Sequence, residues 1–454
     1  EIKDYTISPS GALTTSNTEV TISYGGKSVK QSINVKTINL DNSGANAPEL
    51  TSNMIPVYYD STSDSWKKAD SNNKDNNYKW YDYDNKIWAN AVTVSETNRQ
   101  TYLNADAGTT IPMSDINTMW VWVPRYTYTY FNTNTPQEIK IKFESGTNSS
   151  GTIKCTDNVT GTSSTSETCT DTTNNGLVAG TSTYTHPAFW WDKNDNNVRE
   201  TGEELTGIWV GKFEISSGQI IKPNVTSLRS QTVNQLYTGI YNMRNSGNAF
   251  GFSTTDETHM MKNMEWGAVT YLSHSKYGIN KEVAINSANT YTTGCGPQSE
   301  GSTSYGATCN SYTTALGQSA STTGNISGVY DMSGGAFEYV MGNMVNSSGA
   351  FYLSSSGFSS TPNAKYYDKY SYGTSSTEYT RGKLGDATKE MAPVSSSNTS
   401  WYSDYADFPF SSYYWFYRGG SYGNGADAGA FSFNNNGGYA YGDGSSRAVL
   451  GVLD

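Results

Sequence analysis

The feature that most constrains the fold is a near-continuous apolar run, Met119-Trp120-Val121-Trp122-Val123-Pro124-Arg125. Such a short run of bulky residues without polar alternation predicts a buried β-strand. Two further runs also predict strands. Ile139 to Glu144 alternates cleanly and predicts a half-exposed strand, whereas Ile208 to Ile215 predicts another strand of the same domain.

Two segments carry a helical period. Apolar residues recur at helical spacing in Gln231 to Arg244, and Met264, Ala268, Tyr271 and Leu272 do so in a second helix expected from about Asn263 to Ser273. Beyond Tyr291 we expect mostly loops and short strands. Strands and helices therefore occur together, and the fold class expected is α+β with long loops.

The chain is expected to divide into three parts. Residues 1–40 contain two alternating runs around Gly25-Gly26, which predict a hairpin, and resemble the end of a bacterial immunoglobulin-like domain. They are too few for a sandwich of about 100 residues, so upstream strands or a partner are expected to complete them. Residues 41–110 form a small aromatic β-rich module, and residues 111–454 form the main domain.

The aromatic module contains Trp66, Trp80 and Trp88 together with several tyrosines. Two interpretations stay open. The aromatic side chains are either the core of a small β-unit that has little else to bury, or a surface on which carbohydrate rings stack.

The amino-acid composition favours some classes of protein and argues against others. Only 16% of the residues are charged, 35 are tyrosines, and Ser, Thr, Asn and Gly are abundant, which is typical of a secreted or surface β-rich protein. The net charge of −11 argues against nucleic-acid or anionic-membrane binding. The sequence contains no run of 18 apolar residues, so no segment is expected to span a membrane. No signal peptide is visible, so a mature or truncated chain is expected.

The four cysteines fall into two local pairs, Cys155 with Cys169 and Cys295 with Cys309. Each pair brackets a loop rich in Gly, Ser and Thr, and no Cys-x-x-Cys spacing or adjacent histidine favours a metal. We expect two disulfides, with free thiols as the alternative. A disulfide that closes a loop of this length stabilises by about 3 kcal/mol on the chain-entropy model, and it implies an extracytoplasmic setting.

The C-terminal segment, residues 413–453, has two kinds of position. We define its frame as Arg418-Gly419-Gly420-Ser421, Ala428-Gly429-Ala430-Phe431 and Arg447-Ala448-Val449-Leu450. Between these pieces lie Tyr, Asn, Gly, Ser, Asp and Ala with no helical or strand period. This composition is typical of adaptable binding surfaces, in which Tyr provides contact area and Ser, Gly and Asn provide flexible hydrogen bonding.

Motif blocks in a fixed order carry a resemblance to a known family. They are Trp122-Val123-Pro124, Trp209 to Glu214, Asn263 to Trp266, Gly328 to Tyr339, and Arg418 to Ser421. Together they resemble the formylglycine-generating-enzyme branch of the C-type lectin fold. Gly335 and Ala336 depart from the Asn-Val of that family, and Tyr339 replaces its Trp. The resemblance implies a C-type lectin domain over residues 111–454, in which these motif residues have structural roles.

The enzymes of that family require residues that this chain lacks. Aerobic formylglycine formation uses a cysteine pair near the C-terminal block, but no cysteine follows Cys309. The related iron-dependent enzymes use three histidines, and His186, His259 and His274 do not have the spacing of a ligand cluster. No Gly-x-Ser-x-Gly motif occurs either. We therefore expect a protein that is not an enzyme, with no catalytic residues.

The segment 413–453 also resembles the C-terminal ends of the variable proteins of diversity-generating retroelements, in which mutagenesis directed at adenines rewrites surface positions. The resemblance implies a variable, ligand-binding face, with an ordinary polar loop as the alternative. The positions of this variable face are Tyr422, Gly423, Asn424, Ala426, Asp427, Ser432, Asn434, Asn435, Asn436, Gly438, Tyr439, Tyr441 and Asp443, extended by Tyr413, Tyr414, Trp415 and Tyr417.

A second motif predicts a calcium site. Oxygen donors recur at loop positions 1, 3, 5, 9 and 12 from Asp192, and position 7 offers a backbone carbonyl, as in single-loop calcium sites. The candidate ligands are Asp192, Asn194, Asn196, Val198, Glu200 and Glu203. A solvated acidic turn is the alternative. No other cofactor is expected.

Three functions follow from these observations. The first is a surface or virion adhesin that binds a cell-surface protein or glycan through the variable face. The second is a structural subunit of a filament or pilus, in which the N-terminal strands are exchanged between copies of the chain. The third is a degenerate formylglycine-generating-type enzyme. The expected location is extracellular, on a bacterial cell or a phage particle.

Overall fold

The computed structural model describes residues 5–8, 19–32, 41–51, 53–153, 156–158, 166–168, 177–193, 202–391 and 398–452. The chain divides into two compact units, residues 1–40 and residues 41–454. The segment 41–110, which the sequence set apart as a module, is not a compact unit of its own. Its strands extend a sheet of the following domain, and this shared sheet joins the two segments.

The first unit is an antiparallel sheet in the order β1-β2-β3. Its strands are β1 (Thr6–Ser8), β2 (Glu19–Tyr24) and β3 (Lys27–Ser32). The predicted hairpin is confirmed, because β2 pairs with β3 across Gly25-Gly26. Both glycines have positive φ, 56° and 76°, which suits the turn that joins twisted strands through two residues.

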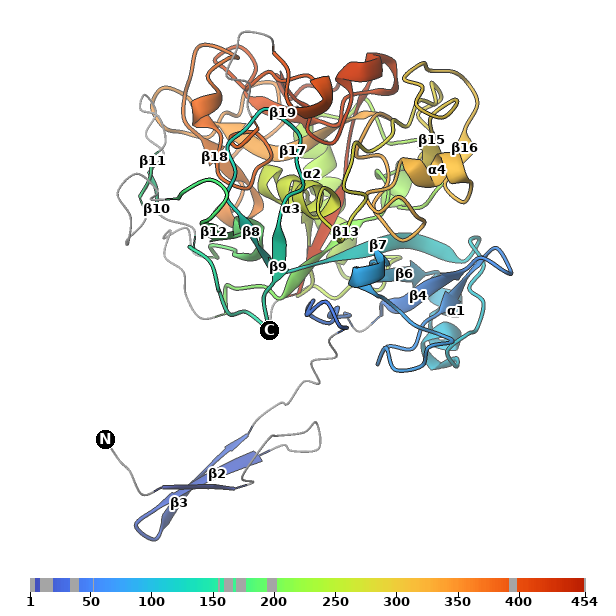
Figure 1. Ribbon diagram of the computed structural model, residues 1–454, viewed down its shortest axis with the longest axis vertical. Helices are drawn as coiled ribbons and strands as arrows, with labels where there is room; N and C mark the ends of the chain where they lie inside the picture. The colour runs from blue at the N-terminus through green and yellow to red at the C-terminus, as the bar shows by residue number, and fades with distance from the viewer. Residues whose placement is uncertain are drawn as a thin grey trace. The chain divides into compact units, whose positions relative to one another are not determined.

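The second unit is built on a seven-stranded sheet in the order β14-β22-β13-β7-β6-β4-β5, and each adjacent pair is antiparallel. Its strands are β4 (Ile55–Asp60), β5 (Ser65–Lys68), β6 (Asn90–Val94), β7 (Ile116–Pro124), β13 (Gly207–Gly211), β14 (Glu257–Met260) and β22 (Ala448–Gly451). Figure 1 shows β4, β6 and α1 (Glu96–Asn104) together at one end of this unit.

Strand β7 lies in the middle of this sheet, between β13 and β6. Trp120 and Trp122 are fully buried, and Trp122 faces Trp209 of β13 in register, with 5.2 Å between their ring centroids. The apolar run from Met119 therefore forms the buried strand that it predicts. The aromatic residues at 66, 80 and 88 are also buried, which supports the core interpretation and removes the carbohydrate-stacking one.

A second sheet, which carries the C-terminal segment, has the order β18-β17-β19-β20, and β21 also pairs with β17. Its strands are β17 (Phe337–Met344), β18 (Asp368–Tyr370), β19 (Trp415–Arg418), β20 (Phe433–Asn436) and β21 (Gly444–Ser446). Strand β17 pairs antiparallel with β19 and parallel with β18 and β21. Strands β19, β20 and β21 all come from residues 413–453, so this segment is built into the sheet.

Smaller sheets and helices complete the described part of the chain. The small-sheet strands are β8 (Tyr126–Thr129), β9 (Ile141–Phe143), β12 (Thr183–Thr185), β10 (Thr156–Asn158), β11 (Ser166–Thr168), β15 (Cys295–Gly296) and β16 (Asn310–Ser311). The helices are α2 (Val233–Tyr241), α3 (Asn263–Ser273) and α4 (Ala315–Ser319). The protein is therefore α+β, as predicted.

Helix α3 has the predicted bounds, and all of its residues are buried. Its N-terminus is stabilised by Glu265, whose carboxylate accepts a hydrogen bond from the backbone N–H of Lys262 at 2.8 Å. The helix predicted from Gln231 to Arg244 is shorter, because α2 ends at Tyr241 and a 3₁₀ turn follows. Helix α1 was not predicted, since none of its residues is buried and its sequence has no apolar stripe.

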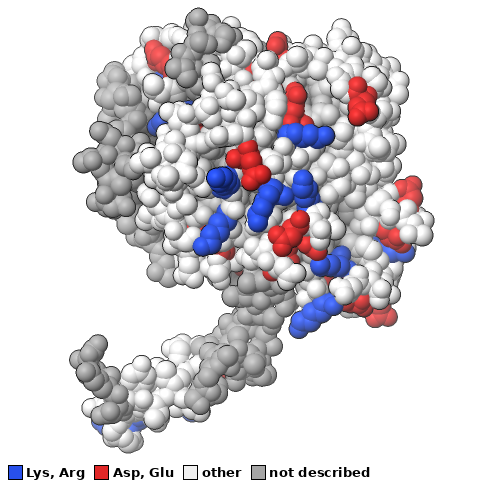
Figure 2. All heavy atoms as spheres, viewed as in Figure 1, with Lys and Arg blue, Asp and Glu red and all other residues white. Residues whose placement is uncertain are grey.

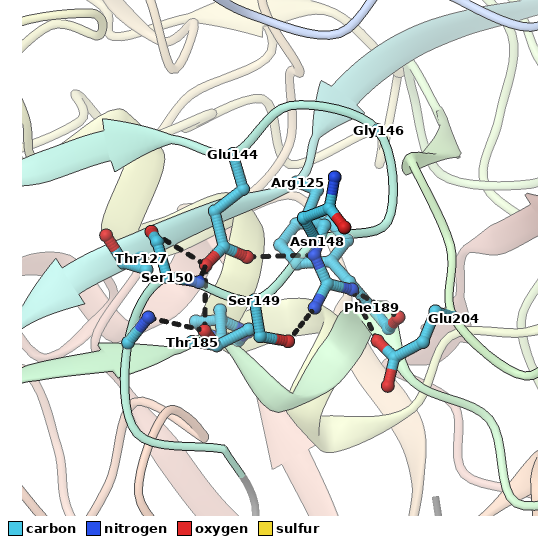
Figure 3. A network of polar contacts seen from close by, with 12 residues as sticks. Arg125, Thr127, Glu144, Gly146, Asn148, Ser149, Ser150, Thr185, Phe189 and Glu204 are labelled. Carbon is cyan, nitrogen blue, oxygen red and sulfur yellow. Dashed lines mark hydrogen bonds and ion pairs between the residues drawn. The ribbon is translucent and has the colours of Figure 1, made fainter. Parts of the chain in front are cut away.

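A buried ion pair ties the small sheet β12-β8-β9 to the domain (Figure 3). Nε of Arg125 donates to the Glu144 carboxylate at 2.8 Å, and both side chains are fully buried. Arg125 also donates to Glu204 at 2.7 Å and to the hydroxyl of Ser149 at 2.7 Å. Because a buried charge is costly unless it is fully hydrogen-bonded, this network holds the end of β7 in one arrangement.

Candidate ligand-binding face

The frame begins with Arg418 at the end of β19. Its guanidinium is fully buried and donates to Asn263 Oδ1 at 3.0 Å and to the carbonyls of Asp386 and Ala387, each at 3.2 Å. Burial lowers the pKa of Arg418 to about 10. The structural role expected for this arginine thus consists of hydrogen bonds to an amide oxygen and to backbone carbonyls.

The last piece of the frame begins with Arg447, which joins several motif blocks. Its guanidinium donates to both carboxylate oxygens of Glu338, at 2.5 and 3.1 Å, and these two side chains are fully buried. It also donates to the carbonyls of Gly211 and Tyr330, each at 2.8 Å. A bidentate contact of this kind fixes geometry as well as charge, so Arg447 positions β17 against β13.

At two positions of the frame, neighbouring atoms leave no room for a side chain, which explains why glycine occurs there. Gly420 has a φ of 71°, and a Cβ there would lie 2.7 Å from Ala428. At Gly429 a Cβ would overlap the carboxylate of Asp404. Larger residues are therefore excluded at both positions, which are the points where the chain turns beneath the variable face.

The positions of the variable face divide by exposure into three groups. The exposed ones are Tyr413, Gly423, Asn424, Ala426, Asp427, Tyr439 and Tyr441. The half-buried ones are Tyr422, Asn434, Asn435 and Asp443. The buried ones are Tyr414, Trp415, Tyr417, Ser432, Asn436 and Gly438.

The buried group corrects the prediction of an all-surface face. Trp415 is fully buried and stacks on Phe358, with ring centroids 5.9 Å apart. Tyr414 is 7% exposed and stacks on Tyr352 at 3.6 Å. Asn436 accepts a hydrogen bond from the Tyr339 hydroxyl at 2.6 Å. These three side chains belong to the packing that supports the face.

Gly438 and Ser432 also belong to the support. Gly438 has a φ of 85°, and a Cβ there would lie 2.6 Å from the Trp415 ring. Ser432 is 2% exposed and precedes β20. A variable position must accept many side chains, whereas the space at Gly438 accepts none.

Two adjoining hollows lie over the exposed and half-buried positions. One has a volume of about 190 Å³, and the other, about 100 Å³. The first is lined by Phe337, Tyr413, Tyr417, Asn434, Asn435, Asn436, Tyr439 and Tyr441. The second is lined by Phe337, Tyr405, Gly420, Asn424, Asp427, Ser432 and Asn434. Tyr405 and Phe337 were missed by the sequence analysis, because neither lies within residues 413–453.

Tyr417 forms the floor of the larger hollow. Its ring stacks on Phe337, with centroids 5.0 Å apart, and its ring centroid lies 4.1 Å from that of Tyr339. Burial and the neighbouring Tyr339 raise the pKa of Tyr417.

Charge is sparse on the surface seen in Figure 2, where acidic and basic side chains lie interspersed and large areas carry neither. Over the part of the chain that the structure describes, no helix is long and apolar enough to span a bilayer. The two hollows are likewise poor in charge, because Asp427 is the one charged residue in their linings.

Most of the predicted calcium loop lies outside the described residues, namely Asn194, Asn196, Val198 and Glu200. Of the candidate ligands that the structure does describe, Glu203 accepts hydrogen bonds through its carboxylate from Trp190 Nε1 at 3.1 Å and from the backbone N–H of Lys193 at 3.0 Å. Among the described residues no three His, Cys, Asp or Glu side chains gather into a metal-binding group. Calcium binding at Asp192 stays a prediction.

The predicted disulfide Cys295–Cys309 is confirmed, with 5.0 Å between the Cα atoms. It closes a loop next to the strand pair β15-β16. Cys155 and Cys169 lie outside the described residues, and their pairing stays a prediction.

The three histidines have separate hydrogen-bond partners. His186 contacts the carbonyl of Gly385 at 3.0 Å, His259 contacts Glu265 at 2.9 Å, and His274 contacts the hydroxyl of Tyr402 at 2.5 Å. Burial lowers the pKa of His186 to about 3, so its imidazole is neutral at physiological pH.

Comparison with known proteins adds no relative. No protein-family model matches the chain, and no curated protein matches it in sequence.

Proposed function

We propose that this chain is a non-enzymatic ligand-binding protein of a bacterial surface or phage particle. It displays a diversified face at its C-terminus on a C-type lectin domain of the formylglycine-generating-enzyme type. The observation that carries the proposal is the division of residues 413–453: exposed Tyr and Asn side chains line two adjoining hollows, and buried arginines hold the backbone beneath them.

Contacts between the motif blocks support the proposed fold. Lys212 of the second block donates to the carbonyl of Gly328 at 2.8 Å, and Glu214 accepts from the backbone N–H of Ala336 at 3.0 Å. Trp266 of the helical block donates to the carbonyl of Ala430 at 2.9 Å. Blocks far apart in sequence thus meet around one centre, which is what a shared structural role requires.

The lining of the hollows supports a ligand that is a protein or a glycan. Tyr439 and Tyr441 have ring centroids 6.2 Å apart and are exposed by 40% and 36%, so they offer apolar rings and free hydroxyls at the surface. The amides of Asn434 and Asn435 supply donors and acceptors between them. Such side chains contact many ligands with little loss of conformational entropy.

The disulfide Cys295–Cys309 supports an extracellular location, because disulfides persist mainly in oxidising compartments.

The genetic test is to sequence many natural copies of the gene. We expect substitutions to concentrate at exposed positions such as Tyr413, Asn424, Tyr439 and Tyr441, while the frame and Trp415 stay unchanged. A near-copy of the 3′ end beside a reverse transcriptase gene would accompany this pattern. Substitutions spread evenly over residues 413–453 would overturn the proposal.

The binding test uses arrays of purified surface proteins and glycans probed with the full chain. The double variant Tyr439→Ala/Tyr441→Ala should lose the signal of wild type. A matched control is Tyr24→Ala, which removes a tyrosine that is 55% exposed in the other unit and should bind as wild type does. Equal loss in both variants, or an oxidase activity with copper or iron on thiol peptides, would contradict the proposal.

One observation favours a second function, a filament subunit. In the first unit every residue of β3 is exposed, and Ile22, Tyr24 and Val29 are 45%, 55% and 68% exposed. A sheet of this kind can accept a strand from another chain. Electron microscopy of the purified protein tests this function, and only single particles would argue against it.

A further inference from the structure

A separate cavity of about 740 Å³ borders the C-terminal segment. Gly425 and Ala428 of this segment line one side, and the loop after α3, the disulfide loop, α4, Ser333 and Tyr402 line the others. Its volume falls within the range of sites that hold small molecules. Apart from Gly425 and Ala428 its lining lies outside residues 413–453, so the variable face does not include it.

The rim of this cavity carries charged groups without an ion-pair partner among the described residues. Lys281, Glu282 and Glu300 line it, and none of them forms an ion pair or hydrogen bond with the described residues. Burial raises the pKa of Glu282, so its carboxylate has lost part of its hydration without gaining a cation. Two acids against one lysine leave the cavity with a net negative charge.

The floor combines apolar side chains with one unsatisfied hydroxyl. Ile285 is 4% exposed, and Pro297 and Leu316 lie beside it in the lining. Ser333 is 2% exposed, and its Oγ has no hydrogen-bond partner in the described structure. Buried hydroxyls are nearly always paired, so this one indicates a place where a ligand atom binds.

The cavity wall is held in place without a ligand. The disulfide Cys295–Cys309 brackets the residues 297–303 that line the cavity. Within that loop, Nδ2 of Asn310 donates to the carbonyl of Pro297 at 2.6 Å, and Gln298 donates to the carbonyl of Thr308 at 2.8 Å. A wall fixed in this way loses little entropy when a ligand binds.

We propose that this cavity is a second binding site, for a small ligand that carries a protonated amine on an apolar body. The amine binds the carboxylates of Glu282 and Glu300, the apolar body rests on Ile285, Pro297 and Leu316, and a polar ligand atom pairs with Ser333. The site is a property of the constant scaffold and does not rest on the proposed variability of residues 413–453.

The test is calorimetric titration of the full chain with 2-phenylethylamine and hexylamine. The matched neutral probes are 2-phenylethanol and hexanol, which keep the apolar body and lack the charge. We expect the amines to bind at least about tenfold more tightly than the alcohols, because only the amines form ion pairs with the two carboxylates. Equal affinities for amines and alcohols, or no binding of the amines, would overturn the proposal.

Variants assign the binding to this cavity. Glu282→Gln/Glu300→Gln should weaken amine binding at least about tenfold and leave the melting temperature unchanged, since both side chains are on the exposed rim. Ser333→Ala should weaken it less. Glu96→Gln is the control. It removes an exposed acid of α1 that does not line the cavity, so it should leave binding unchanged. Amine binding that survives the double variant would place the site elsewhere and refute the proposal.

Discussion

The frame and the variable face come from the same forty-odd residues at the C-terminus, yet they differ in almost every physical property. Frame residues such as Arg418 and Arg447 are fully buried and make three or more hydrogen bonds each. Face residues such as Tyr439 and Tyr441 are exposed, and their rings lie next to each other. The comparison teaches that neighbours in sequence can differ completely in burial and hydrogen bonding, and we expect their tolerance to substitution to differ accordingly.

The largest effect is expected from Arg447→Met. This change leaves the Glu338 carboxylate buried without its cation, so the free energy of unfolding should fall by about 3–5 kcal/mol. Urea denaturation measures it. Lys79→Met is the control, since it removes one partner of the surface pair Lys79–Asp82 and should cost at most about 1 kcal/mol. A loss from Arg447→Met as small as that of the control would break the distinction between frame and face.

Trp415→Ala sharpens the boundary between the two groups. Because Trp415 packs in the core against Phe351 and Phe358, the change should cost about 3–5 kcal/mol of unfolding free energy. Its exposed neighbour Tyr413→Ala provides the comparison and should cost far less. If both variants unfolded at the same denaturant concentration, Trp415 would belong to the face.

The buried carboxyl of Glu390, outside residues 413–453, predicts that stability depends on pH. Burial and the nearby Asp386 raise the pKa of Glu390 to about 7, above its value in the unfolded chain. The folded protein then binds more protons than the unfolded chain between about pH 4.5 and 7, so this contribution, on the order of 1–3 kcal/mol, is lost as the pH rises through that window.

The measurement for Glu390 is a series of urea denaturations from pH 5 to pH 8, for wild type and for Glu390→Gln. Glutamine keeps the shape: its oxygen accepts from one of the Tyr128 and Tyr271 hydroxyls, which contact the two Glu390 oxygens at 2.5 and 2.7 Å, and its NH2 group donates to the other hydroxyl oxygen. The variant should lose less stability than wild type over this range. Parallel profiles would show that Glu390 does not titrate there.

The calcium prediction concerns a loop outside residues 413–453. At a calcium concentration ten times the dissociation constant, binding should stabilise the wild type by about 1.4 kcal/mol and raise its melting temperature. Asp192→Ala should abolish this response, and magnesium serves as the control ion. If calcium did not change the melting temperature of the wild type, the solvated acidic turn would be the correct interpretation.

The smallest effects are expected on the face itself. Tyr439→Ala and Tyr441→Ala should each change the free energy of unfolding by less than about 0.5 kcal/mol, because exposed positions without specific partners contribute little. Thermal denaturation checks this. A loss above 1 kcal/mol would mean that the tyrosines support the fold and are not free to vary.

The sequence by itself determined the local elements with strong periodicity. It predicted α3 with its bounds, the hairpin β2–β3, the buried strand β7 and the disulfide Cys295–Cys309. Each depends on residues close together in the chain, whose spacing or turn chemistry is enough to specify the conformation. The sequence did not predict helix α1, because this helix has no apolar stripe that a periodic pattern would reveal.

Only the tertiary structure decided which members of the C-terminal segment are exposed. Trp415 and Gly438 have the composition expected of the face, but they are buried by Phe358, by Ser356 and by each other. Phe337 joins the hollow from β17, and the cavity of about 740 Å³ gathers residues from α4 and from several segments far apart in sequence. Burial is set by contacts between residues distant in sequence, so local composition predicts the kind of surface and tertiary packing selects its members.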